Sequence, residues 1–305
     1  MISQTYFSPG KLLITSEYFV LDGALAFAVP TFLGQKMEVS EISDSKNLII
    51  WNAFHENKEW LNIKIDYKNW QILEGNIPDS AVFILNVFKN IRELNPDKFS
   101  TDSSYYFKTN LQFPSNFGLG SSSTLMNNLA KWAEINPFVL NEKSLGGSGY
   151  DIAIAAQNHA ILFQNSDGKN NVETINFNPP FLDELVLIHL NQKQNSREGI
   201  ELYKSKERSQ SLINYFSELT EYIIKSSDIE EFSTFIEKHE IGVSHFLGLK
   251  TVKNLHFSDC PVFIKSLGAW GGDFVLSRKF PNYKNYFANK NYFTVFDWKE
   301  IVKTF

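Results

Sequence analysis

The first third of the chain is dominated by strand-like patterns. Residues 35–42 and 61–67 alternate apolar and polar positions, as strands with one buried face do. Residues 12–33 are rich in β-branched, leucine and aromatic side chains and contain Asp22-Gly23, a hairpin signal between two apolar runs. This part of the chain is therefore predicted to form a β-meander.

Helices are predicted where apolar residues recur at spacings of three and four. The predicted helices are 80–94, 124–134, the first part of 149–163, 198–226 and 229–247, and a short linker holding Pro137 follows the second of them. Further strands are expected at 104–111, 185–190, 292–296, the end of 149–163 and on both sides of a glycine turn within 261–278. Because strands and helices interleave irregularly, the pattern predicts an α+β fold without strict βαβ alternation.

Composition narrows the classes of function. A chain of 305 residues suits one large domain or two modest ones sharing a cleft. A formal net charge of −5 argues against a nucleic-acid partner. The single cysteine, Cys260, excludes an intrachain disulfide and a CxxC metal site. No segment resembles a signal peptide or the roughly 18–20 apolar residues of a membrane helix, so we expect a cytoplasmic protein without a membrane partner.

The segment Pro114-Ser-Asn-Phe-Gly-Leu-Gly-Ser-Ser-Ser-Thr124 is the strongest candidate for chemistry. Its glycines allow tight bends and close approach of a ligand to the backbone. Its serines precede a predicted helix, where unpaired N–H groups and the helix dipole favour phosphate. The pattern is neither a Walker loop nor GxGxxG. A glycine-rich turn with a serine N-cap is the structural alternative.

Four segments in order resemble the GHMP kinases, a family that includes galactokinase and the homoserine, mevalonate and phosphomevalonate kinases. The segment 114–124 resembles the family's phosphate loop, and 8–18 (SPGKLLITSEY) resembles its first motif. The stretch 147–153 (GSGYDIA) resembles the surroundings of its catalytic aspartate, and 265–273 (KSLGAWGGD) resembles its third motif. The resemblance is nearest to the phosphomevalonate and mevalonate kinase branch. It implies a two-lobed fold, with a ribosomal-protein-like N-terminal lobe at 1–180 and a ferredoxin-like C-terminal lobe at 181–305.

The resemblance also implies roles for single residues. Asp151 matches the aspartate that accepts or orients the proton of the attacking hydroxyl, and Lys11 matches a lysine expected beside it. Glu17 matches a first-motif glutamate, for which we expect a structural role. ATP and Mg²⁺ are the implied cofactors, with Ser122 and, more loosely, Glu142 as metal ligands. The residues expected to bind ATP phosphates are Pro114, Gly118, Leu119, Gly120, Ser121, Ser122 and Ser123.

A small acidic substrate is expected at two places. The loop after strand 185–190 contains basic and hydroxyl side chains suited to carboxylate or phosphate, although a polar loop with Ser196 as N-cap is equally compatible with it. The expected substrate-binding residues are Lys193, Ser196, Arg197, Lys265, Gly268, Ala269, Gly271 and Gly272. Three residues depart from the family pattern. Ser16 replaces a glycine and Ser123 replaces an alanine. Trp270 stands in a glycine run, where its indole is expected to close part of the acceptor pocket.

The function predicted from this resemblance is an ATP-dependent kinase acting on a mevalonate-pathway acid, with phosphomevalonate slightly favoured over mevalonate. Three alternatives stay open: an ATP-dependent diphosphomevalonate decarboxylase, a sugar or homoserine kinase, and a non-catalytic binding protein of the same fold. The protein is expected to be a monomer or homodimer. The six histidines show no HxH or HExxH spacing, so we expect them in the core or on the surface and not on a metal.

Overall fold

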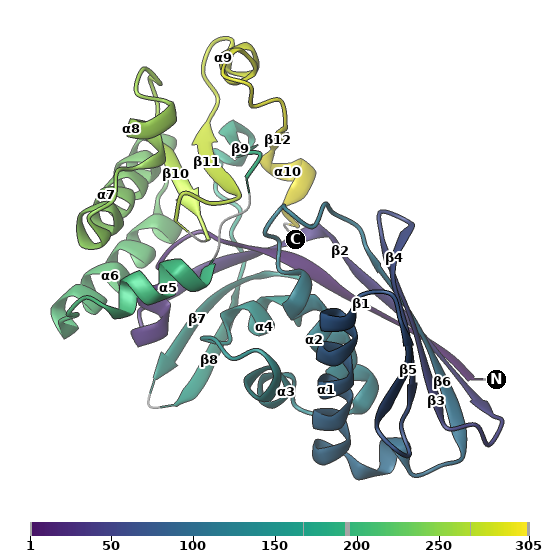
Figure 1. The fold of residues 1–305 in the computed structure, drawn as a ribbon. Coiled ribbons are helices and arrows are strands. Elements are labelled where there is room, and N and C mark those ends of the chain that lie inside the picture. The colour runs from purple at the N-terminus through teal and green to yellow at the C-terminus, as the bar shows by residue number, and fades with distance from the viewer. Residues whose placement is uncertain (1, 167, 193–195, 269, 304–305) are drawn as a thin grey trace. The chain divides into compact units, whose positions relative to one another are not determined.

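The computed structural model describes residues 2–166, 168–192, 196–268 and 270–303 (Figure 1). The chain folds into two compact units, each assembled from separate stretches of sequence. Unit 1 contains Met1–Gly10, Leu33–Ser115 and Gly120–Ala156, and unit 2 contains Lys11–Phe32, Asn116–Leu119 and Gln157–Phe305. The predicted lobes 1–180 and 181–305 stay a prediction.

Unit 1 is built on a twisted sheet. Its strand order is β5-β4-β3-β6-β2, and β1 also pairs with β2. The strand β6 lies between β2 and β3 and runs parallel to β3, so the predicted meander is wrong. The parallel pair requires a long crossover, which the helix between β5 and β6 supplies. The bounds are β1 Ile2–Leu13, β2 Ala26–Ser43, β3 Leu48–His55, β4 Lys58–Asp66, β5 Gln71–Gly75 and β6 Ser103–Leu111.

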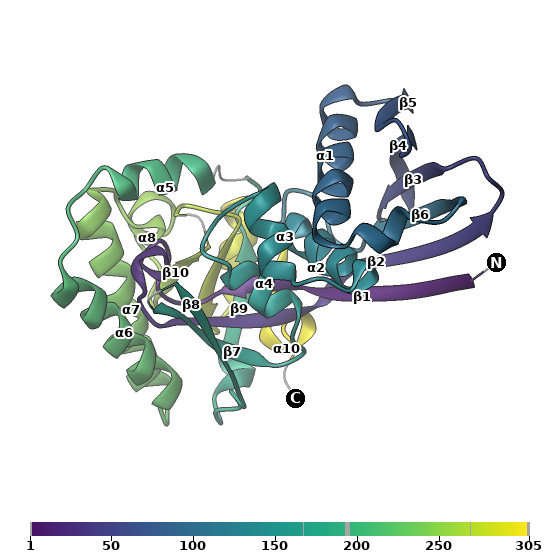
Figure 2. The same cartoon turned by 90° about the horizontal axis from the view of Figure 1, so that it is seen from below.

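Helices pack on one face of this sheet, as Figures 1 and 2 show for α1 and α2. Their shared core is aromatic: the Phe107 ring lies 4.8 Å from that of Trp132, 5.0 Å from that of Phe88 and 5.4 Å from that of Trp51. The predicted linker at Pro137 is instead the start of a helix, because Asn136 caps it and proline suits its first turn. The bounds are α1 Pro78–Leu94, η2 Pro96–Phe99, α2 Ser121–Ala133, α3 Pro137–Ser144 and α4 Tyr150–Ala155.

Unit 2 contains the hairpin β7–β8, in which β7 also pairs with residues 26–28 of β2. It also contains a separate antiparallel sheet of order β10-β11-β9-β12. The central strand β9 is buried along its whole length, as its continuous apolar run predicts. The bounds are β7 Ala160–Ser166, β8 Lys169–Ile175, β9 Leu185–His189, β10 Ile264–Leu267, β11 Phe274–Arg278 and β12 Val295–Asp297.

Two predictions for unit 2 are corrected by the structure. The Asp22-Gly23 pair ends a short helix, η1 (Phe19–Asp22), with Gly23 in the left-handed conformation, and does not form a two-residue hairpin. The long helix predicted at 198–226 is two helices, because Ser209 starts a second one by accepting the N–H of Leu212. The remaining bounds are η3 Leu182–Glu184, α5 Ser196–Lys204, α6 Gln210–Lys225, α7 Ile229–Leu247, α8 Val252–His256, α9 Tyr283–Asn289 and α10 Trp298–Ile301.

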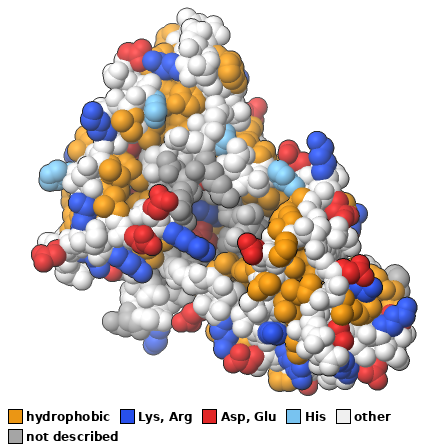
Figure 3. Space-filling model, viewed as in Figure 1, with side chains coloured by type: hydrophobic (Ala, Val, Ile, Leu, Met, Phe, Trp, Pro, Cys, Tyr) orange, Lys and Arg blue, Asp and Glu red, His pale blue; other side chains and the backbone are white. Residues whose placement is uncertain are grey.

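The surface carries both signs of charge. On the face drawn in Figure 3, basic and acidic side chains are interspersed and border exposed hydrophobic ones. In the ranges that the structure describes, no helix has the length and apolarity needed to span a bilayer.

Candidate functional site

The first half of the predicted phosphate loop, residues 116–119, is fixed within unit 2 by strands β9 and β11. The His189 Nε2 atom lies 3.3 Å from the carbonyl oxygen of Asn116, and Nδ1 of the same ring accepts the N–H of Asn191 at 3.3 Å. Since Nδ1 accepts, Nε2 carries the proton and donates to the loop. The Phe117 ring packs 4.5 Å from His189 and 5.3 Å from Phe274. The loop is therefore held by buried neighbours rather than by solvent-exposed contacts.

Two residues of this loop, Gly118 and Leu119, make its closest contacts. The Lys11 N–H donates to the carbonyl of Leu119 at 3.0 Å, which joins the first motif to the loop. A Cβ added at Gly118 would overlap the carboxylate of Asp273, and Gly118 has a φ of +65°. Only glycine combines this conformation with this close approach. Asp273 is a site residue that sequence reasoning missed, although it ends the third motif.

The second half of the loop begins helix α2 in unit 1. Gly120, with φ 83°, is the N-cap and offers no side-chain oxygen to the first turn. The Ser123 hydroxyl donates to the Gly120 carbonyl at 2.8 Å, whereas Ser122 is exposed on the same turn. The uncapped N–H groups and the helix dipole favour a phosphate at this end. Of the three predicted serines, Ser122 is thus better placed than Ser123 to contact a ligand.

A buried asparagine joins α2 to the helix that carries Asp151. The Asn127 amide donates to the Ser8 hydroxyl at 2.7 Å and to the carbonyl of Ala155, at the end of α4, at 2.8 Å. Asp151 lies in the first turn of α4, after Gly149 with φ 90°. Asn127 therefore fixes helix α2 relative to helix α4, which carries the candidate base Asp151. Sequence reasoning missed it, although a buried asparagine within an apolar helix is itself a signal.

The predicted partners of Asp151 and of the substrate are placed only in part. Lys11 belongs to unit 2 and Asp151 to unit 1, so their expected proximity stays a prediction. Lys193 and Ala269 lie outside the described residues. Helix α5 begins at Ser196 and exposes Arg197 in its first turn. Gly268, Gly271 and Gly272 form the turn of the third motif, and the first two have φ values of 70° and 74°.

The predicted magnesium ligands, Ser122 and Glu142, stay a prediction. Among the described residues, no group of three or more His, Cys, Asp or Glu side chains is arranged to hold a metal. Mg²⁺ in nucleotide sites typically keeps several waters and few protein ligands, which suits an exposed hydroxyl such as that of Ser122. Glu142 is exposed on α3, and its assignment stays a prediction.

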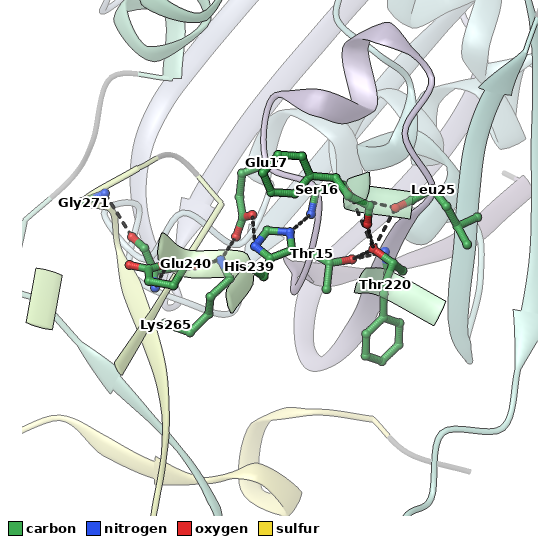
Figure 4. A network of polar contacts seen from close by, with 12 residues as sticks. Thr15, Ser16, Glu17, Leu25, Thr220, His239, Glu240, Lys265 and Gly271 are labelled. Atoms are coloured by element: carbon green, nitrogen blue, oxygen red, sulfur yellow. Dashed lines mark hydrogen bonds and ion pairs between the residues drawn. The ribbon is translucent and has the colours of Figure 1, made fainter. Parts of the chain in front are cut away.

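A buried charge cluster in unit 2 joins the first motif, through Glu17, to the third motif, through Lys265 (Figure 4). The Lys265 ammonium contacts Glu17 Oε1, donates to the carbonyl of Ser266 at 2.5 Å and lies 3.5 Å from Glu240 Oε2. The side chain of Lys265 is 0% exposed. Its charge is therefore matched inside the protein, which gives it structural contacts in place of the predicted substrate contact. The expected structural role of Glu17 agrees with this placement.

The protonation of the cluster follows from its contacts. Burial raises the pKa of Glu240 to about 8, against the lowering effect of Lys265. Burial also raises the pKa of Glu17, which Lys265 opposes through its charge and hydrogen bond. We assign the negative charge to Glu17, the nearer partner of Lys265, and the proton to Glu240. A buried single cation is then balanced by a single anion.

His239 is the neutral member of the cluster. Its Nε2 accepts the N–H of Ser16 at 2.7 Å, and its Nδ1 lies 3.7 Å from Glu17 Oε2. Burial, with a smaller effect of Lys265, holds the pKa of His239 well below its ordinary value. The proton of the neutral ring is therefore on Nδ1, facing the carboxylate. This histidine lies in the core, one of the two positions that the sequence left open for it.

Solved structures of similar fold match this chain almost from end to end. The mevalonate kinase of Methanococcus jannaschii has a TM-score of 0.70 and 16% identity, covering 100% of this chain and 99% of that chain. The phosphomevalonate kinase of Streptococcus pneumoniae, in complex with phosphomevalonate and AMPPNP, has a TM-score of 0.69 and 16% identity, covering 97% and 99%. Galactose-bound galactokinase of Lactococcus lactis has a TM-score of 0.68 and 12% identity, covering 99% and 93%. Comparison with protein families and with curated protein sequences finds no match.

Proposed function

We propose that this chain, which has the α+β fold of the GHMP kinases, is an ATP-dependent kinase acting on a small acid of the mevalonate pathway, with phosphomevalonate slightly favoured over mevalonate. The observation that carries the proposal is the glycine loop itself: residues 116–119 are held by β9 and β11 within unit 2, and the next residue, Gly120, starts α2 without a side-chain cap. The similarity of the whole chain in fold to mevalonate and phosphomevalonate kinases also supports the proposed kinase activity.

Catalysis on this proposal depends on positioning and on charge. The end of α2 and the Ser122 hydroxyl bind the nucleotide phosphates. Asp151 accepts or orients the proton of the attacking hydroxyl, and Lys11 stabilises negative charge that develops during transfer. Bound Mg²⁺ would neutralise charge on the transferred phosphoryl group, with Ser122 as its protein ligand.

The proposed acceptor is chosen by comparing its negative charge with the positively charged side chains predicted to bind it. A phosphorylated acid brings about two negative charges in addition to its carboxylate, and these require local cations in a protein of net charge −5. Because the Lys265 ammonium is buried against Glu17, the candidate set is Lys11, Lys193 and Arg197. Arginine offers a two-pronged contact to carboxylate or phosphate, so Arg197 is the residue to test first.

The test is an ADP-release assay with a panel of acceptors: phosphomevalonate, mevalonate, diphosphomevalonate, homoserine and galactose. We expect turnover of phosphomevalonate, a product heavier by one phosphoryl group by mass spectrometry, and little activity in Asp151→Asn. Release of carbon dioxide and phosphate from diphosphomevalonate would indicate a decarboxylase instead. Turnover of galactose or homoserine alone would refute the acceptor, and ATP binding without any turnover would indicate a binding protein.

The acceptor assignment has its own variant. Arg197→Ala is expected to raise KM for phosphomevalonate by about tenfold and to leave KM for ATP nearly unchanged, since it removes a contact to one substrate only. Lys206→Ala is a matched control because Lys206 follows the same helix in sequence. Equal effects on both substrates would contradict a role of Arg197 in acceptor binding.

A further inference from the structure

The segment Ser16–Tyr18 has a strained backbone. Ser16 has φ 63° and Tyr18 has φ 62°, backbone angles that residues other than glycine rarely adopt. The strain is held in place by contacts: Ser16 N–H donates to His239, and Glu17 contacts Lys265. Strained residues of this kind persist only where the surroundings fix them, and they gather at functional sites.

The Tyr18 side chain reaches the turn of the third motif. Its hydroxyl oxygen accepts the backbone N–H of Trp270 at 2.8 Å. Its ring stacks on Tyr203 with centroids 5.9 Å apart, and burial raises the pKa of the Tyr18 phenol. The Trp270 side chain is only 8% exposed and belongs to the same hydrophobic cluster. The indole thus anchors the turn in the core of unit 2, and the expectation that it closes part of the acceptor pocket stays a prediction.

The same hydroxyl also explains why α5 has a glycine at position 199. A Cβ added at Gly199 would overlap the Tyr18 hydroxyl and stand 2.7 Å from Cζ of its ring. Glycine is disfavoured inside helices, so its presence in the middle of α5 requires a reason, and this close approach supplies one. Arg197 lies two residues earlier on the same short helix. One hydroxyl therefore contacts both segments that are predicted to bind the acceptor.

We propose that Tyr18 is a positioning residue whose hydroxyl sets the third-motif turn and helix α5 in one fixed geometry for acceptor binding. This inference rests on the proposed function and adds to it a residue that determines how the acceptor is held. Gly268 belongs to the same turn, and a Cβ added there would meet none of the described atoms within 4 Å. Loss of the hydroxyl shifts the turn and α5 together and weakens acceptor binding, while nucleotide binding at α2 is unaffected.

The test is Tyr18→Phe, which removes the hydroxyl and keeps the ring on Tyr203. We expect KM for the acceptor to rise by about tenfold and KM for ATP to stay within about twofold, as for loss of one hydrogen bond to a buried N–H. Tyr286→Phe is the matched control, because its hydroxyl also lies in unit 2 but donates to Asp259 at 2.7 Å, outside α5 and the third-motif turn. The control should leave the acceptor KM unchanged. A rise in both variants, or in neither, overturns the proposal.

A second readout does not require activity. Amide hydrogen exchange should accelerate at Trp270 and along α5 in Tyr18→Phe and not in Tyr286→Phe. Gly199→Ala should have the same effect, and its effect should be smaller in the Tyr18→Phe background because the overlapping hydroxyl is absent. Unchanged exchange at both segments overturns the proposal even if the chain is a kinase. Faster exchange in a chain that phosphorylates none of the acceptors refutes the proposed function and confirms the clamp formed by the hydroxyl.

Discussion

Replacing Glu240 by glutamine should make the protein less sensitive to pH, because glutamine mimics the protonated acid and cannot ionise. Glu240 is 3% exposed, and its Oε2 accepts the N–H of Ser266 at 3.2 Å and lies 3.5 Å from the Lys265 ammonium. The charge of Glu17 also acts on Glu240, and Glu17 already matches the lysine's charge. An ionised Glu240 would therefore be a second buried anion with no cation of its own.

The sign and size of the effect follow from the pKa. Its value is about 8 in the folded protein and 4.5 in an ordinary environment. A raised pKa gives a contribution to stability that is complete below pH 4.5 and is lost as the pH rises towards 8. At about 1.4 kcal/mol per pH unit, the wild-type protein should lose on the order of 3 kcal/mol relative to Glu240→Gln between pH 5 and pH 8.

The assay is urea unfolding of both proteins at several values between pH 5 and pH 8.5. The other groups titrate in both proteins. The difference in the free energy of unfolding between wild type and Glu240→Gln therefore reports the contribution of Glu240 alone. Glu237→Gln is the matched control, because Glu237 lies one turn earlier on α7 and forms a partly exposed pair with Lys253. That variant should follow the wild type across the range. A difference between wild type and Glu240→Gln that stays constant to within about 1 kcal/mol would refute the assigned protonation.

Three further outcomes are expected. Asp151→Asn should bind ATP nearly normally and lose turnover by about 10² to 10⁴-fold, measured by isothermal titration and steady-state kinetics; retention of half the rate would exclude it as the base. Gly120→Val should weaken nucleotide affinity because Gly120 has φ 83° and begins α2, and titration with a fluorescent ATP analogue tests this; unchanged affinity would place the nucleotide elsewhere. Lys265→Met should destabilise the fold by about 3–5 kcal/mol, and Glu17→Gln in the same chain should restore part of the loss; additive effects in urea unfolding would contradict the buried pair.

Local patterns were sufficient for most elements of the fold. Helix α1 and strand β6 follow from side-chain spacing, and the buried run of β9 follows from its continuous apolar residues. The strand β3, the helix at Pro137 and the break at Ser209 were not predicted. Each of these depends on a cap, or on pairing with a strand distant in sequence, which a window of hydrophobicity does not detect.

The sequence by itself determined which residue types are available for chemistry: the glycine-bordered loop 114–124, the aspartate at 151 and the glycine turn 268–272. Only the tertiary structure decided how several of them are used. Lys265 looks like a substrate contact in sequence, but it is buried against Glu17, 248 residues away along the chain. Asp273, Asn127 and Tyr18 also gain their roles from neighbours that are distant along the chain. Local sequence sets backbone preference and residue chemistry, whereas burial and charge pairing depend on which distant segments the fold brings together.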